Sequence, residues 1–357
     1  MTIGLIIIAA ALIAVLQKHW APQFLQYLRF HGQCDRIMAQ PGEIIRWSRS
    51  IENSSRFPIS FVRLREVFPH EATLHMDERW KSRHCQQGLY QTFAEERLTM
   101  APRRKWSKSI DLSISKRGKY NIGKFRMCTG DLLGFNEAHV EGDGDVVVII
   151  PDRARNQHSL QAVSGFLGDI SVRRFILEDP ILTVGFRDYT GREPMKSISW
   201  TRSATAGKLQ VKQYDYTAEQ TVMILLNVED GNQETFEACL RLMRTVCEEL
   251  EKKKIPYGLR TNGNLPGTVG NIFFLPEGLG KRHLDTILYA LGCADDTRYH
   301  SFRFMATHTL QHRKNNEAYI VITPKVTKDV THYVHRLQSV AGNPVCVLYG
   351  ESEVEAS

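Results

Sequence analysis

The periodicity of the hydrophobic residues changes once along this chain, and the change separates two kinds of structure. From Pro41 to about residue 150, apolar and polar residues alternate with a period of two, in short runs separated by turn residues. This pattern is typical of the antiparallel strands of a β-sandwich. We therefore expect a β-sandwich domain over residues 34–151, with strands near the segments 43–53, 59–68, 106–115, 120–127 and 146–150.

From Thr221 onwards, apolar runs alternate with amphipathic segments. Largely apolar runs at 222–226, 318–323 and 345–349 are typical of strands that are buried on both faces. This alternation predicts a mostly parallel, doubly wound α/β sheet over residues 221–350, followed by a tail at 351–357. A strand is expected at 257–261, and helices are expected at 283–291, at 326–340 and where apolar residues recur at Phe236, Leu240, Met243, Cys247 and Leu250.

The N-terminal residues form the most apolar stretch of the chain. Ile3–Leu16 is an uninterrupted apolar run that approaches the minimum length of a membrane-spanning helix. A cleaved signal peptide and a buried core helix are the alternatives. Lys18, Arg29 and Arg36 follow the run, so the positive-inside rule predicts a single-pass protein of the cell membrane, anchored through residues 3–17, with its globular part in the cytoplasm. Residues 1–33 would then comprise the anchor and an interfacial helix.

The composition excludes few classes of function. A net charge of +7 suits an anionic membrane surface as well as nucleic acid. No nucleic-acid-binding motif accompanies the charge, so no nucleic-acid partner is expected. The seven cysteines are scattered and include no CxxC pair, which argues against a disulfide framework or a zinc site and favours a reducing compartment.

The sequence contains none of the common catalytic motifs. A Walker A phosphate loop, a GxSxG nucleophile elbow and an HExxH zinc motif are all missing from it. The histidines of the C-terminal half have no convincing metal-ligand spacing. We therefore expect neither a cofactor nor an enzymatic activity.

The segment Gly185–Lys212 carries the most specific signal of the chain. Its sequence, GFRDYTGREPMKSISWTRSATAGKLQVK, is rich in charged, aromatic and glycine residues and falls in an expected connecting segment, 152–220. Such side chains can pair within a polar joint between two domains or can form an active site, but no nucleophile or tuned base is evident. The candidate interaction residues are Gly185, Arg187, Asp188, Tyr189, Gly191, Glu193, Lys196, Trp200, Ser203 and Lys212.

This segment resembles the signature of the bacterial family called domain of unknown function 58. The matching positions include Arg187, Tyr189, Trp200 and Lys212, whereas Thr205 stands where the family has an arginine. The resemblance implies a membrane anchor, a β-sandwich and a C-terminal domain similar to von Willebrand factor A domains. Members are commonly encoded beside MoxR-type AAA+ ATPases, so the resemblance also implies such a partner.

The resemblance gives little support to a metal site. The metal-binding Asp-x-Ser-x-Ser loop of von Willebrand factor A domains would fall at Asn227, Glu229 and Gly231, where all three positions differ. Glu229 and Asp230 are the remaining weak candidates for cation ligands. Our leading hypothesis is a membrane-anchored cytoplasmic scaffold or adaptor that binds a protein partner. The alternative is a divalent-cation-dependent hydrolase or ligand receptor that uses Asp188, Glu193, Glu229 and Asp230.

Overall fold

The structure is a computed structural model, and its chain forms two compact units, Met1–Asp152 and Arg153–Ser357. The residues described are 21–130, 137–155, 157–174, 183–191, 193–214, 220–265, 273–314, 316–341 and 344–350.

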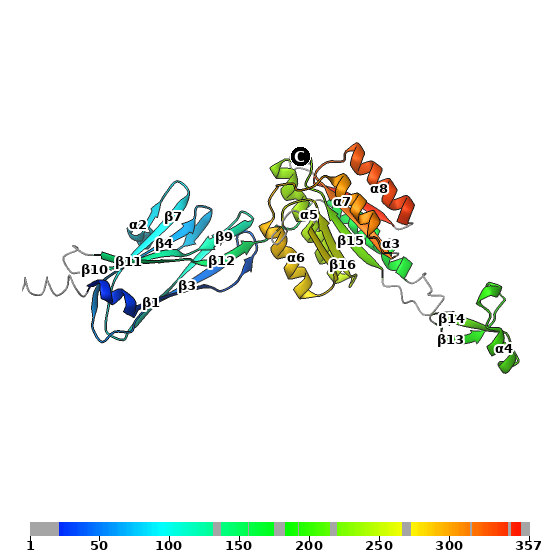
Figure 1. Ribbon diagram of the computed structural model, residues 1–357, viewed down its shortest axis with the longest axis horizontal. Helices are drawn as coiled ribbons and strands as arrows, with labels where there is room; N and C mark the ends of the chain where they lie inside the picture. The colour runs from blue at the N-terminus through cyan, green and yellow to red at the C-terminus, as the bar shows by residue number, and fades with distance from the viewer. Residues whose placement is uncertain are drawn as a thin grey trace, which may run out of the picture. The chain divides into compact units, whose positions relative to one another are not determined.

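The first unit consists mainly of strands (Figure 1). Its elements are the 3-10 helix η1 (Ala21–Tyr27), strands β1 (Leu28–Cys34), β2 (Met38–Ala39), β3 (Ile44–Asn53), β4 (Ile59–Pro69) and β5 (Ala72–His75), helix α2 (Glu78–His84), and strands β6 (Cys85–Gln87), β7 (Gln91–Met100), β8 (Lys105–Ile114), β9 (Gly118–Ile122), β10 (Lys124–Gly130), β11 (Glu137–Gly142) and β12 (Asp145–Ile149).

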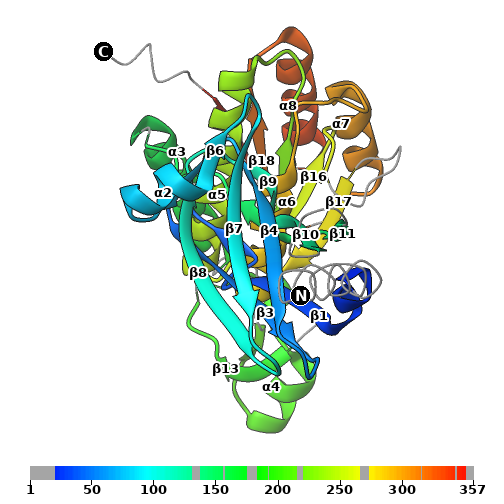
Figure 2. The same cartoon turned by 90° about the vertical axis from the view of Figure 1, so that its left-hand side faces the viewer.

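These strands form three sheets. A four-stranded sheet has the order β1-β3-β8-β5, and a five-stranded sheet has the order β11-β10-β4-β7-β6. Both are antiparallel, and Figure 2 shows β4 and β7 of the second sheet side by side. In the third sheet, β2-β12-β9, β2 runs parallel to β12.

The core of the first unit follows from the period-two pattern. In β3, Ile45, Trp47 and Ile51 are fully buried, while the residues between them include exposed polar side chains. The Trp47 ring requires glycine in two neighbouring segments. A Cβ atom added at Gly32 or Gly123 would lie 2.3 or 2.2 Å from a ring carbon of Trp47, closer than any side chain allows.

A layer of charged side chains crosses this core. Arg49, on the inward face of β3, forms ion pairs with Glu66 of β4 and Glu96 of β7, and neither the guanidinium nor the Glu66 carboxylate is exposed. Glu66 also accepts a hydrogen bond from Trp47 Nε1 at 2.8 Å, and Lys108 donates to Glu96 at 2.7 Å. The layer separates two apolar clusters, one around Trp47 and Phe68 and the other around residues 51 and 64.

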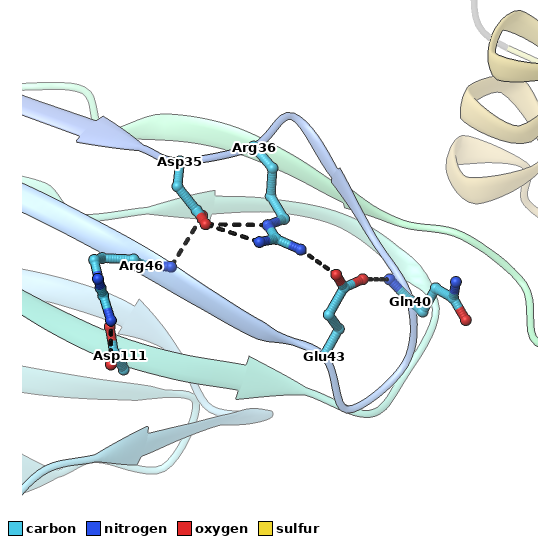
Figure 3. A network of polar contacts seen from close by, with 6 residues as sticks. All are labelled: Asp35, Arg36, Gln40, Glu43, Arg46 and Asp111. Carbon is cyan, nitrogen blue, oxygen red and sulfur yellow. Dashed lines mark hydrogen bonds and ion pairs between the residues drawn. The ribbon is translucent and has the colours of Figure 1, made fainter. Parts of the chain in front are cut away.

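A second polar network lies on the surface of the four-stranded sheet that contains β3 and β8 (Figure 3). Asp35 accepts hydrogen bonds from the Arg36 side chain and from the backbone N–H of Arg46, and Arg36 also pairs with Glu43. Arg46 in turn pairs with Asp111 of β8 at 2.8 Å. The network ties the turn between β1 and β3 to the sheet, and its exposed pairs contribute little stability individually.

The second unit contains a five-stranded sheet with the order β17-β16-β15-β18-β19 and a separate hairpin. Its elements are helix α3 (Gln157–Arg174), strand β13 (Thr183–Asp188), the 3-10 helix η2 (Met195–Ser197), helix α4 (Trp200–Ala206), strands β14 (Gln210–Tyr214) and β15 (Thr221–Leu226), helix α5 (Gln233–Lys252), strands β16 (Tyr257–Thr261) and β17 (Phe273–Gly278), helices α6 (Lys281–Cys293) and α7 (Phe302–Gln311), strand β18 (Glu317–Thr323), helix α8 (Lys328–Ala341) and strand β19 (Val345–Tyr349).

Helices cover both faces of this sheet (Figure 1). Alternate residues of β15, such as Ile224, pack in one cluster with α3, α5 and α6. The residues between them, such as Leu225, pack in a second cluster with α7 and α8. Because both faces are covered, β15 and β18 are almost entirely buried, which explains their apolar sequences.

The fold class expected from the sequence is wrong as a description of the chain. We expected a transmembrane helix, a β-sandwich and a doubly wound domain of the von Willebrand factor A type. The described part of the chain is richer in strands than in helices, and its strands form several separate sheets. The C-terminal sheet is mixed, because β17 runs antiparallel to β16. No helix is described between these two strands, and a parallel pair would need such a crossover.

The membrane assignment also needs correction. Among the described residues, no helix has both the length and the apolar character needed to cross a bilayer. The expected single-pass location, with a cytoplasmic globular part, is therefore wrong on this finding. The predicted anchor, residues 3–17, and the predicted tail, 351–357, lie outside the described residues. The expected interfacial helix is instead the short η1, followed by β1, in which buried and more exposed residues alternate.

Candidate functional site

The segment singled out in the sequence forms a small folded region, residues 183–214, which we call the signature lobe. Strands β13 and β14 pair antiparallel, and η2 and α4 lie in the connection between them. Ile198 and Val211 form a further backbone bridge and are almost completely buried. The helix α4 ends at Gly207, whose φ of 65° is the left-handed conformation that favours glycine at a helix end.

Arg187 and Glu193 close the loop that follows β13. The guanidinium Nη1 of Arg187 lies 2.7 Å from Oε1 of Glu193, and Glu193 also accepts hydrogen bonds from the hydroxyl and the backbone N–H of Thr190. The Thr190 hydroxyl, with a further contribution from Arg187, lowers the pKa of Glu193 to about 2. Gly191 provides the turn between these partners, with a φ of 90°. Glu193 is therefore ionised at neutral pH and acts as a structural group.

The other polar groups of the segment bind the two strands to α4. Asp188 accepts a hydrogen bond from the side chain of Gln210, and Tyr189 N donates to Leu209 O at 2.9 Å. The buried hydroxyl of Ser203 donates to Ser199 O and accepts from Gln210 N, each at 2.8 Å. Gly185 lies in β13, and Lys212 lies in β14. The polar residues of the lobe thus mainly hold its own fold.

The outside of the lobe is apolar and basic. Trp200 is 61% exposed and Met195 is 68% exposed, which are high values for large apolar side chains. Lys196 and Arg202 are exposed near them in the sequence, and the Arg202 guanidinium lies 5.1 Å from the centre of the Phe186 ring. Between residues 183 and 214 there are six Lys and Arg residues against two Asp and Glu residues, so the lobe carries +4 of the net charge of +7.

The two weak metal candidates lie in a different loop, after β15. Oε1 of Glu229 lies 2.5 Å from Arg298 Nη1, and Oε2 accepts the backbone N–H of Phe302 at 2.7 Å, at the start of α7. A cation would have to displace both partners. Asp230 is exposed and has a φ of 62°. In the described part of the chain, no three His, Cys, Asp or Glu side chains are grouped as a metal site would require.

Buried amides hold this loop in place. Asn227 Oδ1 accepts from Asn262 Nδ2 and from Glu229 N, and Asn227 Nδ2 donates to Thr323 Oγ1 at 3.0 Å. Asn262 Oδ1 accepts from Val228 N. The carboxyl ends of β15, β16 and β18 are thus linked by neutral side chains.

Sequence reasoning identified part of the lobe and missed another part. The pairing of arginine with glutamate is present at Arg187 and Glu193, but Trp200, expected within a polar joint, is exposed. Gln210 and Phe186 were not recognised as functional positions. A prediction that β13 and β14 pair would have identified both residues. Their register places Gln210 opposite Asp188 and Phe186 opposite Lys212.

Comparisons with known proteins give limited guidance. No protein-family model matches the chain. The uncharacterized protein YeaD of Bacillus subtilis is 22% identical over 262 residues, which cover 71% of this chain and 62% of that relative's length.

Three of the similar solved structures each match about a third of the chain. A CARDB domain from Pyrococcus furiosus matches 34% of the chain and 91% of its own length, at 9% identity and a TM-score of 0.21. The cupredoxin domain of amoB from Nitrosocaldus yellowstonii matches 35% and 87%, at 6% identity and a TM-score of 0.23. A cohesin from Archaeoglobus fulgidus matches 34% and 91%, at 13% identity and a TM-score of 0.24. At such TM-scores these similarities support no conclusion about fold or function.

Proposed function

We propose that this protein is a non-enzymatic adaptor whose signature lobe binds another protein. The observation that carries the proposal is the exposure of four large apolar side chains in the lobe, those of Phe186, Met195, Trp200 and Leu209. Tryptophan and methionine are enriched in the centres of protein interfaces, and tryptophan is a frequent hot spot of binding energy. The polar groups of the lobe are engaged with one another, so they support this surface.

The charge of the lobe defines the kind of partner. Lys196, Arg202 and Lys208 are exposed, whereas the carboxylates of Asp188 and Glu193 are engaged within the lobe. An acidic surface with a central apolar depression would complement such a lobe, and opposite charges would accelerate association. We propose a MoxR-type AAA+ ATPase as the partner, because the chain resembles the domain of unknown function 58 family, whose members are commonly encoded beside such ATPases.

The test is quantitative binding of the purified protein to an immobilised MoxR-type ATPase from the same organism. We expect Trp200→Ala to weaken the Kd by about 30-fold or more, the loss typical of a hot-spot residue. The charge-reversed variant Lys196→Glu/Arg202→Glu should lower the association rate and weaken its dependence on salt.

Two matched controls lie outside the lobe. Tyr90→Ala removes an aromatic side chain that is 80% exposed, and Lys124→Glu reverses an exposed charge. Both should bind like the unaltered protein. Failure of the unaltered protein to bind at micromolar concentrations would exclude this partner. Equal binding by Trp200→Ala and Tyr90→Ala would exclude the lobe as the binding surface.

A further inference from the structure

A cluster of buried charged groups lies on the face of the C-terminal sheet that α7 covers, near the edge strand β17. Arg260 of β16 is 4% exposed, Glu317 of β18 is 1% exposed, and the Glu277 side chain of β17 is 12% exposed. Five buried side-chain atoms in this cluster have no hydrogen-bond partner among the described residues, namely Nε and Nη1 of Arg260, Oε1 of Glu277, Oε1 of Glu317 and Nδ1 of His308.

The two glutamates each have one occupied carboxyl oxygen. Oε2 of Glu317 accepts from the Tyr319 hydroxyl at 2.9 Å and from Lys314 N at 3.3 Å. Oε2 of Glu277 accepts from Lys314 Nζ at 2.7 Å. Lys314 therefore bridges the two carboxyl groups, since its backbone N–H donates to Glu317 and its Nζ donates to Glu277. Each carboxyl group also shifts the pKa of the other. The Oε1 atoms, which are buried and without a hydrogen-bond partner among the described residues, are where a proton between the two groups would be held.

Two buried carboxyl groups bridged by one lysine cannot both be ionised without strong repulsion. If both were protonated, the nearby cations would have no anion to balance them. We propose that Glu277 and Glu317 share a single proton and that this proton holds the edge strand β17 and the turn before β18 onto the sheet. The pair would thus form a pH-sensitive attachment of β17, a role separate from partner binding by the signature lobe.

Every element packed around the pair contributes to its charge balance. β16 contributes Arg260, whose guanidinium lies 4.8 Å from the centre of the Phe274 ring. Helix α7 contributes His308, and the segment after it contributes His312, Arg313 and Lys314. With one shared proton the pair has a charge of −1, which balances the charge of the buried Arg260. The charge of Lys314 needs no buried counter-charge, because its side chain is largely exposed to solvent.

The two carboxyl groups differ in their protonation. Burial raises the pKa of Glu317. Burial alone would also raise the pKa of Glu277, but the hydrogen bond from Lys314 and its other partners hold it below the ordinary value. The stability contributed by Glu317 is therefore present below the ordinary glutamate pKa, about 4.3, and is lost as the pH rises through its raised value. The contribution of Glu277 is present above that ordinary pKa and is lost as the pH falls through its lowered value. The pair should be most stable between these limits.

Glu317→Gln tests the proposal in the full-length protein. The amide oxygen can accept from Tyr319 and Lys314 as Oε2 does, and the amide NH2 can donate to Glu277 as the shared proton would. We expect denaturant unfolding measured from about pH 2.5 to pH 9 to lose its alkaline decline in this variant and to keep its acid decline. Glu277→Gln should instead lose the acid decline, because Lys314 then has no carboxylate partner. Glu234→Gln, at an exposed position in the first turn of α5, should behave like the unaltered protein.

Two further measurements use the unaltered protein, so they do not depend on the folding of a variant. Infrared spectra at neutral pH should show one carboxylic-acid C=O band, which disappears as the pH rises through the raised pKa of Glu317. With rising pH, the amides of β17 should lose hydrogen-exchange protection before those of β19, the strand at the opposite edge. The absence of the band at neutral pH, an unchanged alkaline decline in Glu317→Gln, or equal loss of protection at both edges would overturn the proposal.

Discussion

At the scale of single residues, Arg49 shows how much a buried charge depends on its partners. Its side chain has no exposed surface and lies between the carboxylates of Glu66 and Glu96. Removing one member of a buried ionic network leaves uncompensated charge in a low-dielectric interior, whereas exposed pairs contribute little. Two arginines of β3, Arg49 and Arg46, allow these two cases to be compared within one strand.

We expect Arg49→Met to lower the free energy of unfolding by about 3–5 kcal/mol, because Glu66 would remain buried without its cation. Arg46→Met breaks the exposed pair with Asp111 and should cost less than about 1 kcal/mol. Urea unfolding followed by tryptophan fluorescence measures both, since Trp47, Trp80 and Trp106 lie in this unit. Equal losses for the two variants would show that the buried layer contributes no more than a surface pair.

At the scale of elements, long periodic patterns predicted structure well and short or irregular ones did not. The strands at 222–226, 257–261, 318–323 and 345–349 and the helices at 283–291 and 326–340 were expected within a few residues of the observed bounds. Helix α3 was missed because its buried residues, Val163, Leu167 and Ile170, are interspersed with glycine and polar residues. Strand β17 was missed because it is an edge strand with a proline and little apolar alternation.

The start of α5 shows a local signal that the sequence does contain. Asn232 accepts from Thr235 N at 2.8 Å, and Thr235 Oγ1 accepts from Asn232 N at 3.0 Å, which together form a capping box. We expect Asn232→Ala to lower the free energy of unfolding by about 1 kcal/mol, because the N–H group of Thr235 loses its acceptor. Gln233→Ala, at the exposed next position, is the control and should be nearly neutral. Chemical unfolding followed by circular dichroism compares the two. A loss in Asn232→Ala no larger than that of the control would contradict the cap's role.

The signature lobe marks the limit of prediction from sequence at this scale. Its residues were singled out because the segment is rich in charged, aromatic and glycine residues, and the Arg187–Glu193 pair follows from opposite charges at short separation. The exposure of Trp200 could not be predicted, since a tryptophan among charged residues fits a buried joint and an open surface equally well. Only the paired strands and α4 determine which side of the segment faces solvent.

At the scale of the whole molecule, the chain consists of two units that each possess their own cores. The apolar clusters of the first unit contain residues from β1 to β12 alone, apart from contacts with η1 and α2. Domains with separate cores normally fold as separate units. The change of periodicity predicts where the kind of secondary structure changes along the chain. The number and pairing of the sheets depend on contacts between distant residues, which periodicity does not encode.

We therefore expect a fragment comprising residues 21–152 to fold without the rest of the chain. Its urea unfolding should be a single cooperative transition, with a midpoint close to that of the corresponding transition in the full-length protein. Dispersed amide resonances and near-ultraviolet circular dichroism would confirm fixed tertiary packing. A fragment with neither property would show that the first unit needs the remainder of the chain.

The charged layer within the first unit also has a consequence for strand register. A period-two pattern forbids a slip by one residue but permits a slip by two, because the same face stays inward. In β3 such a slip would move the guanidinium of Arg49 by about 7 Å along the strand, away from Glu66 and Glu96 and into an apolar cluster. An unpaired charge there costs several kcal/mol of folding free energy, which is more than the rearranged apolar contacts would contribute. One arginine and two glutamates therefore encode the alignment of three strands, and they exclude the misaligned sheets that hydrophobic residues alone would accept.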